Sequence, residues 1–348
     1  MKTISKYLVV LTITMLLTMC QQQTNNSPAP TPKAEISEFI GHWSLDIDGG
    51  GVGWLGVTQE DGYVDAGLLW KGGSVWPVAH VFLVNDKLVV TRTQRKVRTR
   101  DEEGEPDRSH MVTVQLEMTK VSEDTIQGNY LIPNENSIGL DTTEFLGVRF
   151  PEIKDKPDLS NIQYGEPVEL FNGEDLSGWK LINENQKNGW SVVDGVLVNN
   201  PVQPEDGEHI RYGNLRTEQE FEDFNLKLEV NIPEGNNSGI YLRGIYEIQV
   251  LDSYGEELDS HNMGALYSRI TPSTSAEKPA GSWQEMDITL ANRHITVKLN
   301  GTTIIDNQPA LGPTGGAMSH DVFAPGPIYL QGDHGKVSYR NIILTPIK

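Results

Sequence analysis

The chain has 348 residues, of which 37% are hydrophobic, and its net charge of -20 makes it strongly acidic. This length is enough for about two domains at roughly 150 residues each, and the hydrophobic content is enough to bury a core. The acidic balance argues against a nucleic-acid-binding protein, because a phosphate backbone is bound through Lys and Arg.

The first residues have the pattern of a bacterial export signal. Lys2 and Lys6 precede an apolar run, residues 7–17, which is too short to span a bilayer comfortably. The letters LTMC, ending at Cys20, resemble a lipobox. We therefore expect residues 1–20 to be a lipoprotein signal peptide and a lipid on Cys20 to anchor the protein in the cell envelope, on the periplasmic or the outer-membrane surface. An ordinary secretory signal with an incidental cysteine is the alternative.

Residues 21–34 are polar and Pro-rich, which predicts a disordered tether. Residues 35–154 then show closely spaced short strands joined by turn dipeptides such as Asp61-Gly62 and Gly72-Gly73, which predict an antiparallel β-barrel or sandwich. The candidate strands are residues 39–47, 52–57, 63–70, 75–83, 87–92, 111–118, 125–130 and 144–150. The basic residues 92–100, followed by acidic ones, predict a long solvated hairpin. No function follows from this domain.

Residues 155–167 carry Pro, Asp, Asn and Gly without periodicity and are interpreted as an interdomain linker. Residues 168–348 contain alternating runs separated by turn signals, of which Asn300-Gly301 is the strongest. No stretch has a convincing helical period over about ten residues. The fold class predicted for this second domain is therefore all-β, with two packed layers.

The stretch at residues 236–253 (NNSGIYLRGIYEIQVLDS) begins with a turn cluster and continues as one long extended run. Alternation places one set of side chains toward a core: Leu242, Gly244, Tyr246, Ile248 and Val250. The opposite face carries Tyr241, Arg243, Ile245, Glu247, Gln249 and Leu251. This polar face is either a solvated surface with a salt bridge or a sugar-binding face, since Arg, Glu and Gln supply several hydrogen bonds to hydroxyls.

Several segments together resemble one family, the 3-keto-disaccharide hydrolase domain. They are LFNGEDLSGWK at residues 170–180, the stretch at residues 236–253, GALY at 264–267, PAGSWQ at 279–284 and LQGDHGKVSYRNI at 330–342. The resemblance runs over nearly all of residues 168–348. It implies a jelly roll like the concanavalin A-type lectins and glucanases, with a concave face that binds carbohydrate. The N-terminal domain resembles an extra β module that some members carry.

The resemblance implies action on sugars that are already oxidised to a ketone at C3. The ketone acidifies the C2 hydrogen, so that a base can remove it, the enolate can expel the C1 substituent, and water can add to the enone. Such a site needs a base near C2, an acid near the glycosidic oxygen and an electrophile at the ketone oxygen. No nucleotide-binding motif is present, so an upstream sugar 3-dehydrogenase would perform the oxidation.

On this resemblance Glu247 would be the base or a metal ligand, and Arg243 would stabilise the enolate or orient hydroxyls. His334, in a glycine-flanked turn, would bring a titrating group to the site. The expected substrate-binding residues are Tyr241, Gln249, Asp252, His261 and Gln331. The sequence permits a divalent metal ion on Glu247, His261 and His334, although it contains no tight ligand spacing such as HxH or HExxH.

Two other functions stay open at this point. A non-catalytic carbohydrate-binding lipoprotein could use the same face, and the fold alone cannot choose between binding and catalysis. A binding module would tolerate Glu247→Gln, whereas a base or ligand would not. An ordinary hydrolase of unoxidised glycans would need a paired acid and nucleophile, and Glu247 has no second carboxylate at adjacent alternate positions.

Overall fold

The computed structural model describes residues 34–136, 138–153, 155–204 and 208–348. The residues from Ala34 onward form one compact unit. The expected signal peptide, Cys20 and the tether up to residue 33 lie outside the described residues. Within the described ranges, no helix is long and apolar enough to cross a membrane.

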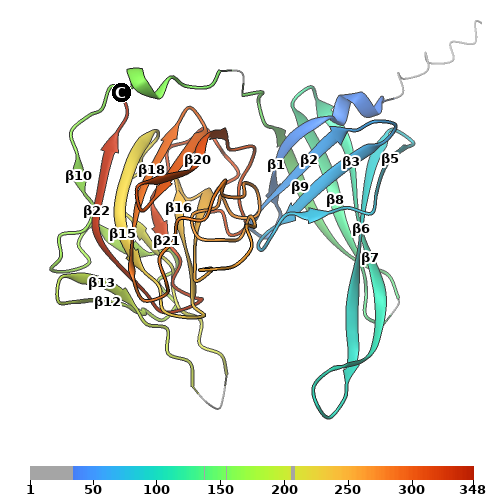
Figure 1. Cartoon of the computed structure of the whole chain (residues 1–348). Helices are drawn as coiled ribbons and strands as arrows, with labels where there is room; N and C mark the ends of the chain where they lie inside the picture. Colours follow the sequence, from blue (N-terminus) through green and yellow to red (C-terminus); the bar gives the residue numbers. More distant parts are fainter. Residues whose placement is uncertain (1–33, 137, 154, 205–207) are drawn as a thin grey trace, which may run out of the picture. The chain divides into compact units, whose positions relative to one another are not determined.

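The N-terminal part is a single antiparallel sheet of nine strands, preceded by a short 3-10 helix, Ile36–Phe39 (Figure 1). The strand order is β4-β3-β2-β1-β9-β8-β7-β6-β5. The bounds are β1 Gly41–Ile47, β2 Val52–Gln59, β3 Val64–Trp70, β4 Trp76–Pro77, β5 His80–Val84, β6 Lys87–Arg100, β7 Pro106–Ser122, β8 Thr125–Pro133 and β9 Leu140–Arg149.

This sheet curls around its own hydrophobic core, as a barrel does. Trp70 of β3 stacks on Tyr130 of β8 with ring centroids 4.1 Å apart, although three strands lie between them in the sheet order. The prediction of an antiparallel β domain is confirmed. The strand expected at residues 75–83 is wrong, because the chain breaks into β4 and β5. The predicted basic hairpin is confirmed as β6 and β7, which turn at residues 101–105.

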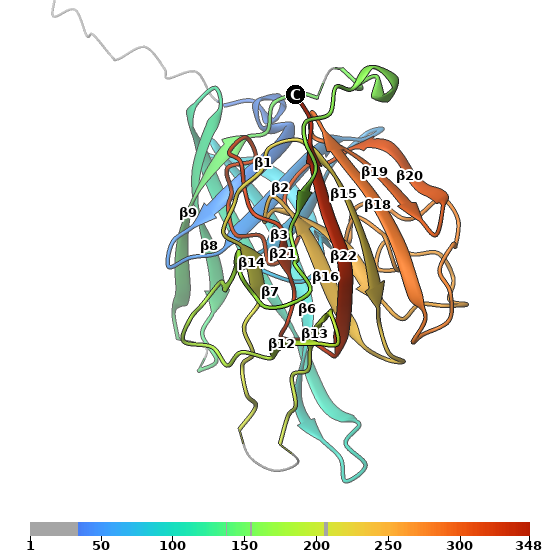
Figure 2. The same cartoon turned by 90° about the vertical axis from the view of Figure 1, so that its left-hand side faces the viewer.

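The C-terminal part consists of two antiparallel sheets packed face to face (Figure 2). The larger has the order β12-β13-β22-β15-β18-β19-β20, with β10 paired to β22, and the smaller has the order β11-β14-β21-β16-β17. A 3-10 turn, Leu159–Asn161, precedes them. The bounds are β10 Val168–Glu169, β11 Trp179–Leu181, β12 Trp190–Val193, β13 Val196–Asn199, β14 Leu215–Thr217, β15 Phe224–Asn231, β16 Asn237–Leu242, β17 Tyr246–Leu251, β18 Trp283–Ala291, β19 His294–Leu299, β20 Thr302–Pro309, β21 Tyr329–Leu330 and β22 Val337–Pro346.

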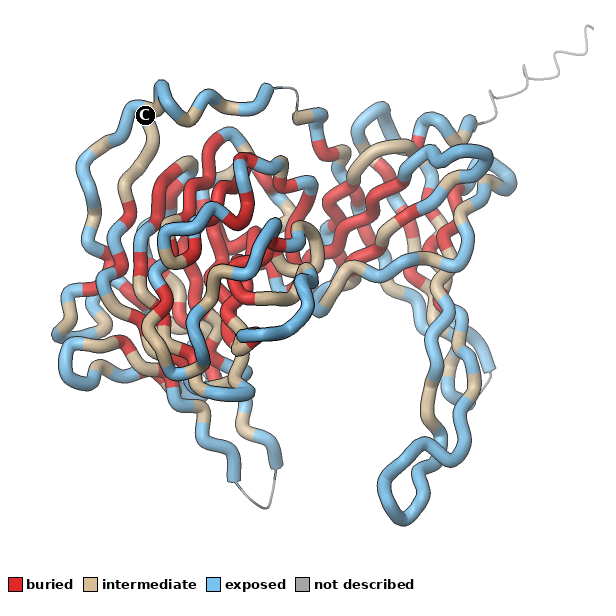
Figure 3. Tube along the Cα trace, viewed as in Figure 1, coloured by how far each residue is buried: buried red, intermediate tan, exposed pale blue. Residues whose placement is uncertain are grey.

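The core of this part lies between the two sheets, where buried residues concentrate (Figure 3). Alternation along each strand explains it, since every second side chain points to the same face. Leu226, Leu228 and Val230 of β15 face Ile240 of β16 and Ile248 of β17 within one cluster of buried side chains. The all-β jelly-roll class predicted from the sequence is therefore confirmed.

The stretch at residues 236–253 is not one long strand but a hairpin of β16 and β17. The chain reverses at Arg243 and Gly244, whose φ angles are 54° and 66°, in the left-handed region. Glycine adopts this conformation without steric cost, so Gly244 permits the reversal. The alternation still assigned Leu242 and Tyr246 to the core correctly, because they are opposite each other in the hairpin register.

Candidate active site

The face of the five-stranded sheet that points away from the core carries the polar residues that the sequence singled out. In the register of β16 and β17, Tyr241 lies opposite Glu247, and Gly239 lies opposite Gln249. Tyr329 of β21 pairs with Tyr241 on the other side. We call the surface formed by Tyr241, Glu247, Gln249, Tyr329 and Gln331 the Glu247 face.

Glu247 is held in a space that only glycine leaves open. Its side chain is buried, with 3% of the residue exposed. A Cβ at Gly239 would lie 2.4 Å from Glu247 Oε1, closer than atoms can approach, so a larger residue there would displace the Glu247 carboxyl group. The backbone N–H of Glu247 donates to Thr314 Oγ1 at 2.9 Å, which fixes the strand against the loop at residues 313–317.

The hydrogen bonds around Tyr241 indicate where the proton of Glu247 lies. The Tyr241 hydroxyl oxygen is 2.7 Å from the carbonyl oxygen of Gly315 and 2.8 Å from Glu247 Oε2. A hydroxyl has one proton, and a carbonyl oxygen can only accept. If Tyr241 donates to Gly315, the second bond needs a proton on Glu247. An ionised Glu247 would accept the hydrogen bond from Tyr241 and leave the Gly315 carbonyl oxygen without that donor.

Burial raises the pKa of Glu247 to about 8, which agrees with this proton count. A hydrogen bond donated by Tyr241 to the ionised carboxylate and a positive charge on protonated His334 act in the opposite direction and lower that pKa, but less strongly. Burial also raises the pKa values of Tyr241 and Tyr329, whose rings stack with centroids 3.8 Å apart. At neutral pH the site therefore contains a buried, neutral carboxylic acid.

The raised pKa predicts a pH dependence of folding stability. In the unfolded chain Glu247 titrates near 4.5, and in the folded chain near 8, so the folded state binds the proton more tightly between these values. Its stability contribution is full below pH 4.5 and is lost as the pH rises through 8, by at most about 5 kcal/mol. We expect Glu247→Gln to abolish this loss.

Urea unfolding of the wild type and of Glu247→Gln at pH 5, 7 and 9 measures the effect. The free energy of unfolding of the wild type should fall more steeply with pH than that of the variant. Glu285→Gln, at an exposed position on β18, serves as the control and should follow the wild type. Parallel curves for the wild type and Glu247→Gln would contradict a buried neutral acid.

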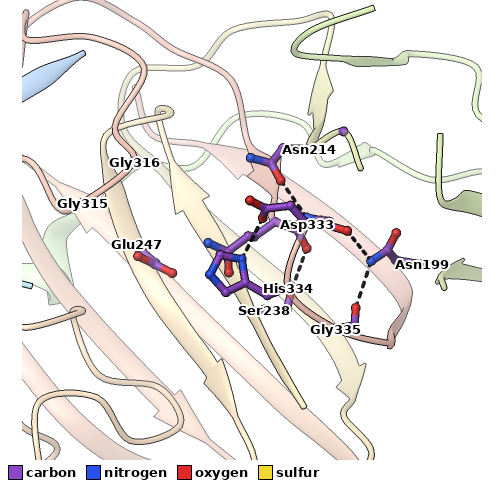
Figure 4. A network of polar contacts seen from close by, with 12 residues as sticks. Asn199, Asn214, Ser238, Glu247, Gly315, Gly316, Asp333, His334 and Gly335 are labelled. Carbon is purple, nitrogen blue, oxygen red and sulfur yellow. Dashed lines mark hydrogen bonds and ion pairs between the residues drawn. The ribbon is translucent and has the colours of Figure 1, made fainter. Parts of the chain in front are cut away.

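His334 lies in the turn that follows β21 and shares the site with Glu247 (Figure 4). Its Nδ1 is 2.8 Å from Asp333 Oδ1. A carboxylate only accepts, so Nδ1 carries the proton, and in the neutral ring Nε2 is the free base. The hydrogen bond to Asp333 is the main cause that raises the pKa of His334, against an opposing effect of burial.

Two asparagines hold this turn in place. Asn199 Nδ2 donates to the carbonyl oxygens of Gly332 and Gly335, at 2.9 Å each. The backbone N–H of Gly332 donates to Asn214 Oδ1 at 2.8 Å. These bonds connect the His334 turn to β13 and to the residue before β14, as Figure 4 shows. The backbone that carries the His334 imidazole is therefore fixed by hydrogen bonds to both Asn199 and Asn214.

Gln249 and Gln331 each present an oxygen without a partner. Oε1 of both side chains is buried and accepts no hydrogen bond within the described chain. A buried polar atom that lacks a partner costs free energy, so such atoms often mark a place where a ligand supplies the missing bond. Sugar hydroxyls are donors that match two such acceptors.

The structure does not bring Arg243 to this site. The guanidinium donates to the carbonyl oxygens of Val322, at 2.9 Å, and of Ala324. The expectation that Arg243 shares a strand face with Glu247 is therefore wrong, because the hairpin turn interrupts the alternation. Asp252 is also placed elsewhere, since its carboxylate accepts from the backbone N–H of Gly235 at 3.0 Å in the turn before β16.

His261 lies on the long loop after β17, bonded to Asp259 and to Ser74 rather than to Glu247. Among the described residues, no group of three or more His, Cys, Asp or Glu side chains is arranged to hold a metal ion. The set of Glu247, His261 and His334 therefore does not form one ligand group.

Sequence reasoning missed Asp333, Tyr329 and Thr314 as members of the site. Asp333 could have been found, because an acidic residue directly before a turn histidine can orient the ring. Tyr329 lies two residues before Gln331 and thus on the same face of an extended segment. Thr314 had no local signal, since its role depends on a contact with a residue 67 positions away.

A jelly roll that combines, on the sheet face away from its core and in the adjoining turn, a buried carboxylic acid, a carboxylate-oriented histidine and unpaired amide oxygens defines a carbohydrate-active protein. Residues 166–345, just over half of the chain, match the 3-keto-alpha-glucoside-1,2-lyase-like domain, and the chain belongs to that family. It is thus a carbohydrate-active enzyme. No curated protein matches the sequence.

Solved structures that are similar to the chain include two proteins of Parabacteroides distasonis assigned as glycosyl hydrolases. One is 28% identical and covers 55% of this chain and 93% of its own, with a TM-score of 0.42. The other is 21% identical and covers 52% and 94%, also with a TM-score of 0.42. A β-glucanase of Bacillus licheniformis is 12% identical, covers 55% of this chain and 100% of its own, and has a TM-score of 0.34.

Proposed function

We propose that this protein cleaves 3-keto-glycosides by elimination across C1 and C2, with water addition to the product as a second step. The observation that carries the proposal is that a neutral buried acid, Glu247, and an imidazole oriented by a carboxylate, His334, lie in one site (Figure 4). Elimination next to a ketone needs both a base and an acid, whereas a binding module needs neither.

His334 is the base in this proposal. Asp333 holds Nδ1–H, so the Nε2 lone pair is free to remove the C2 hydrogen. The C–H electron pair becomes the C2–C3 double bond of an enolate, with the negative charge on the ketone oxygen. The enolate oxygen then reforms the C3 ketone, and the electron pair of the C2–C3 double bond moves between C1 and C2. The C1–O bond to the leaving group breaks, and the new C1–C2 double bond is conjugated with the ketone.

Glu247 is the acid. The departing glycosidic oxygen takes the electron pair of the C1–O bond and accepts the proton from the Glu247 carboxyl group. This assignment replaces the earlier expectation of Glu247 as base, because a carboxyl group with a pKa of about 8 holds its proton at neutral pH. After the reaction Tyr241 can donate to the carboxylate, at 2.8 Å, which limits the cost of the buried charge.

Gln249 and Gln331 bind the sugar. Their unpaired Oε1 atoms would accept hydrogen bonds from hydroxyl groups that flank the reacting carbons. The two glutamines would thus hold the sugar ring and take no part in proton transfer. Water that enters after the aglycone leaves can add to C1 of the enone, and a proton then returns to C2.

The decisive experiment is an assay on a matched pair, p-nitrophenyl glucoside and its 3-keto derivative. We expect release of p-nitrophenol from the keto derivative alone, because only the ketone makes the C2 hydrogen acidic. Release from both compounds would indicate an ordinary glycosidase. Binding of the keto sugar without any release would support the non-catalytic carbohydrate-binding alternative.

A further inference from the structure

A turn of the N-terminal sheet contacts the edge of the Glu247 face. This turn, residues 71–75 (KGGSV), connects β3 and β4. The carbonyl oxygen of Lys71 accepts from the backbone N–H of Gly316 at 3.2 Å. Gly315 also packs directly on Gly73, since a Cβ at Gly315 would lie 2.1 Å from the Gly73 carbonyl oxygen.

Gly315 and Gly316 are the residues whose carbonyl oxygens meet the tyrosines of the site. The Gly315 carbonyl is the partner of Tyr241, and the Gly316 carbonyl lies 3.3 Å from the Tyr329 hydroxyl. The loop at residues 313–317 is therefore in contact with the site on one side and with the 71–75 turn on the other. A shift of the 71–75 turn would therefore move the hydrogen-bond partners of Tyr241 and Tyr329, which adjoin Glu247.

Ser74 makes a second and more specific contact with the same edge. Its Oγ is 2.8 Å from His261 Nε2 and 3.3 Å from the Tyr267 hydroxyl. The backbone N–H of Tyr267 donates to the carbonyl oxygen of Glu247 at 3.0 Å. Leu266 pairs with Ile248 and is buried in the core, so the backbone of Tyr267 lies beside β17 at the position of Glu247.

The directions of these hydrogen bonds can be assigned. Asp259 accepts from Nδ1–H of His261, so Nε2 of the neutral ring accepts from the Ser74 hydroxyl. Ser74 Oγ can then accept from Tyr267. The two rings meet edge to face, with centroids 5.0 Å apart. Ser74 thus contacts both side chains from the N-terminal side.

We propose that Ser74 is a positioning residue for the glycoside site, so that the N-terminal β domain completes the substrate-binding edge instead of being a separate module. The inference rests on the proposed function for its kinetic consequence. His261 and Tyr267, held by Ser74, form the part of the edge against which the group attached at C1 or the far side of the sugar packs. No function of the N-terminal domain followed from its sequence.

Ser74, His261 and Asp259 also have the order of a serine-hydrolase triad, with a nucleophile, a base and a carboxylate. The exposure of Asp259 argues against this, because 62% of its side chain is accessible to solvent. A carboxylate that stabilises an imidazolium during catalysis is buried in serine hydrolases. Asp259 instead orients His261 so that its other nitrogen meets Ser74.

Ser74→Ala tests the inference against two other variants. Ser44→Ala is the matched control, because Ser44 Oγ also joins the N-terminal sheet to the C-terminal part, donating to the His320 carbonyl oxygen at 2.8 Å. Ser74→Thr retains the hydroxyl. On a 3-keto-glucoside we expect Ser74→Ala to raise KM about tenfold with kcat little changed, and Ser44→Ala and Ser74→Thr to stay near the wild type.

Amide hydrogen exchange over residues 259–268 supplies a readout that does not need activity. Exchange there should rise in Ser74→Ala and not in Ser44→Ala. Unchanged KM and exchange in Ser74→Ala, or equal changes in both alanine variants, would overturn the positioning role. If the wild type is inactive on keto-glucosides, the proposed function fails by itself, and the exchange comparison still decides whether Ser74 holds this edge.

Discussion

Glu247→Gln should reduce kcat/KM on a methyl 3-keto-glucoside by about 1,000-fold, within the range of about 10²–10⁴ typical of general acids. Methoxide is a poor leaving group and needs a proton as the C1–O bond breaks. The glutamine amide cannot supply it. Glutamine still fits the space above Gly239 and still meets Tyr241, so the fold should be retained.

The same variant should lose less than about tenfold on the p-nitrophenyl 3-keto-glucoside, because p-nitrophenolate leaves without protonation. The measurement is the ratio of kcat/KM for the two substrates in wild type and variant. Glu285→Gln, at an exposed position, should leave both values unchanged. An equal loss on both substrates would show that Glu247 acts before the C1–O bond breaks, in keeping with the role of base, which the family resemblance offered for Glu247 beside that of metal ligand.

Local patterns in the sequence located most of the Glu247 face. Alternation placed Glu247 and Gln249 opposite the buried Ile248, which the structure confirms. The pattern could not show that the chain reverses between Leu242 and Tyr246, because a glycine inside an alternating run also fits a continuous strand. Arg243 was therefore assigned to the wrong environment.

The electrostatic character of the site could not be predicted, because it depends on residues that are distant in the sequence. Burial raises the pKa of Glu247, and its hydrogen-bond partner Tyr241 also bonds to Gly315, 74 residues further along the chain. Period-2 patterns report which side a residue faces and not what covers it. The contact of Ser74 with His261, over 187 residues, is of the same kind.

The proton inventory of the pair also affects how pH profiles should be interpreted. Glu247 and His334 influence each other's pKa, so the two titrations give macroscopic pKa values that belong to the pair. In the proposed mechanism the active form carries one of the two protons and is populated between these two pKa values. A bell-shaped profile would follow for either assignment of base and acid. Only an experiment that separates removal of the C2 hydrogen from bond cleavage can tell them apart.

Exchange of the C2 hydrogen in deuterated water makes that separation. If His334 is the base, His334→Gln should lower the rate of deuterium incorporation at C2 of 3-keto-glucose by at least about 100-fold, because this step needs no leaving group. Glu247→Gln should retain exchange within about tenfold of the wild type.

His209→Gln, at an exposed loop position, is the control for loss of a histidine. Asp333→Asn should fall between the His334→Gln and Glu247→Gln variants, since an amide can donate to Nδ1 as well as accept from it, and without the Asp333 charge the ring loses basicity. NMR follows the C2 signal directly. If exchange stops in Glu247→Gln and continues in His334→Gln, the two roles are reversed, and the buried carboxyl group must ionise before each turnover.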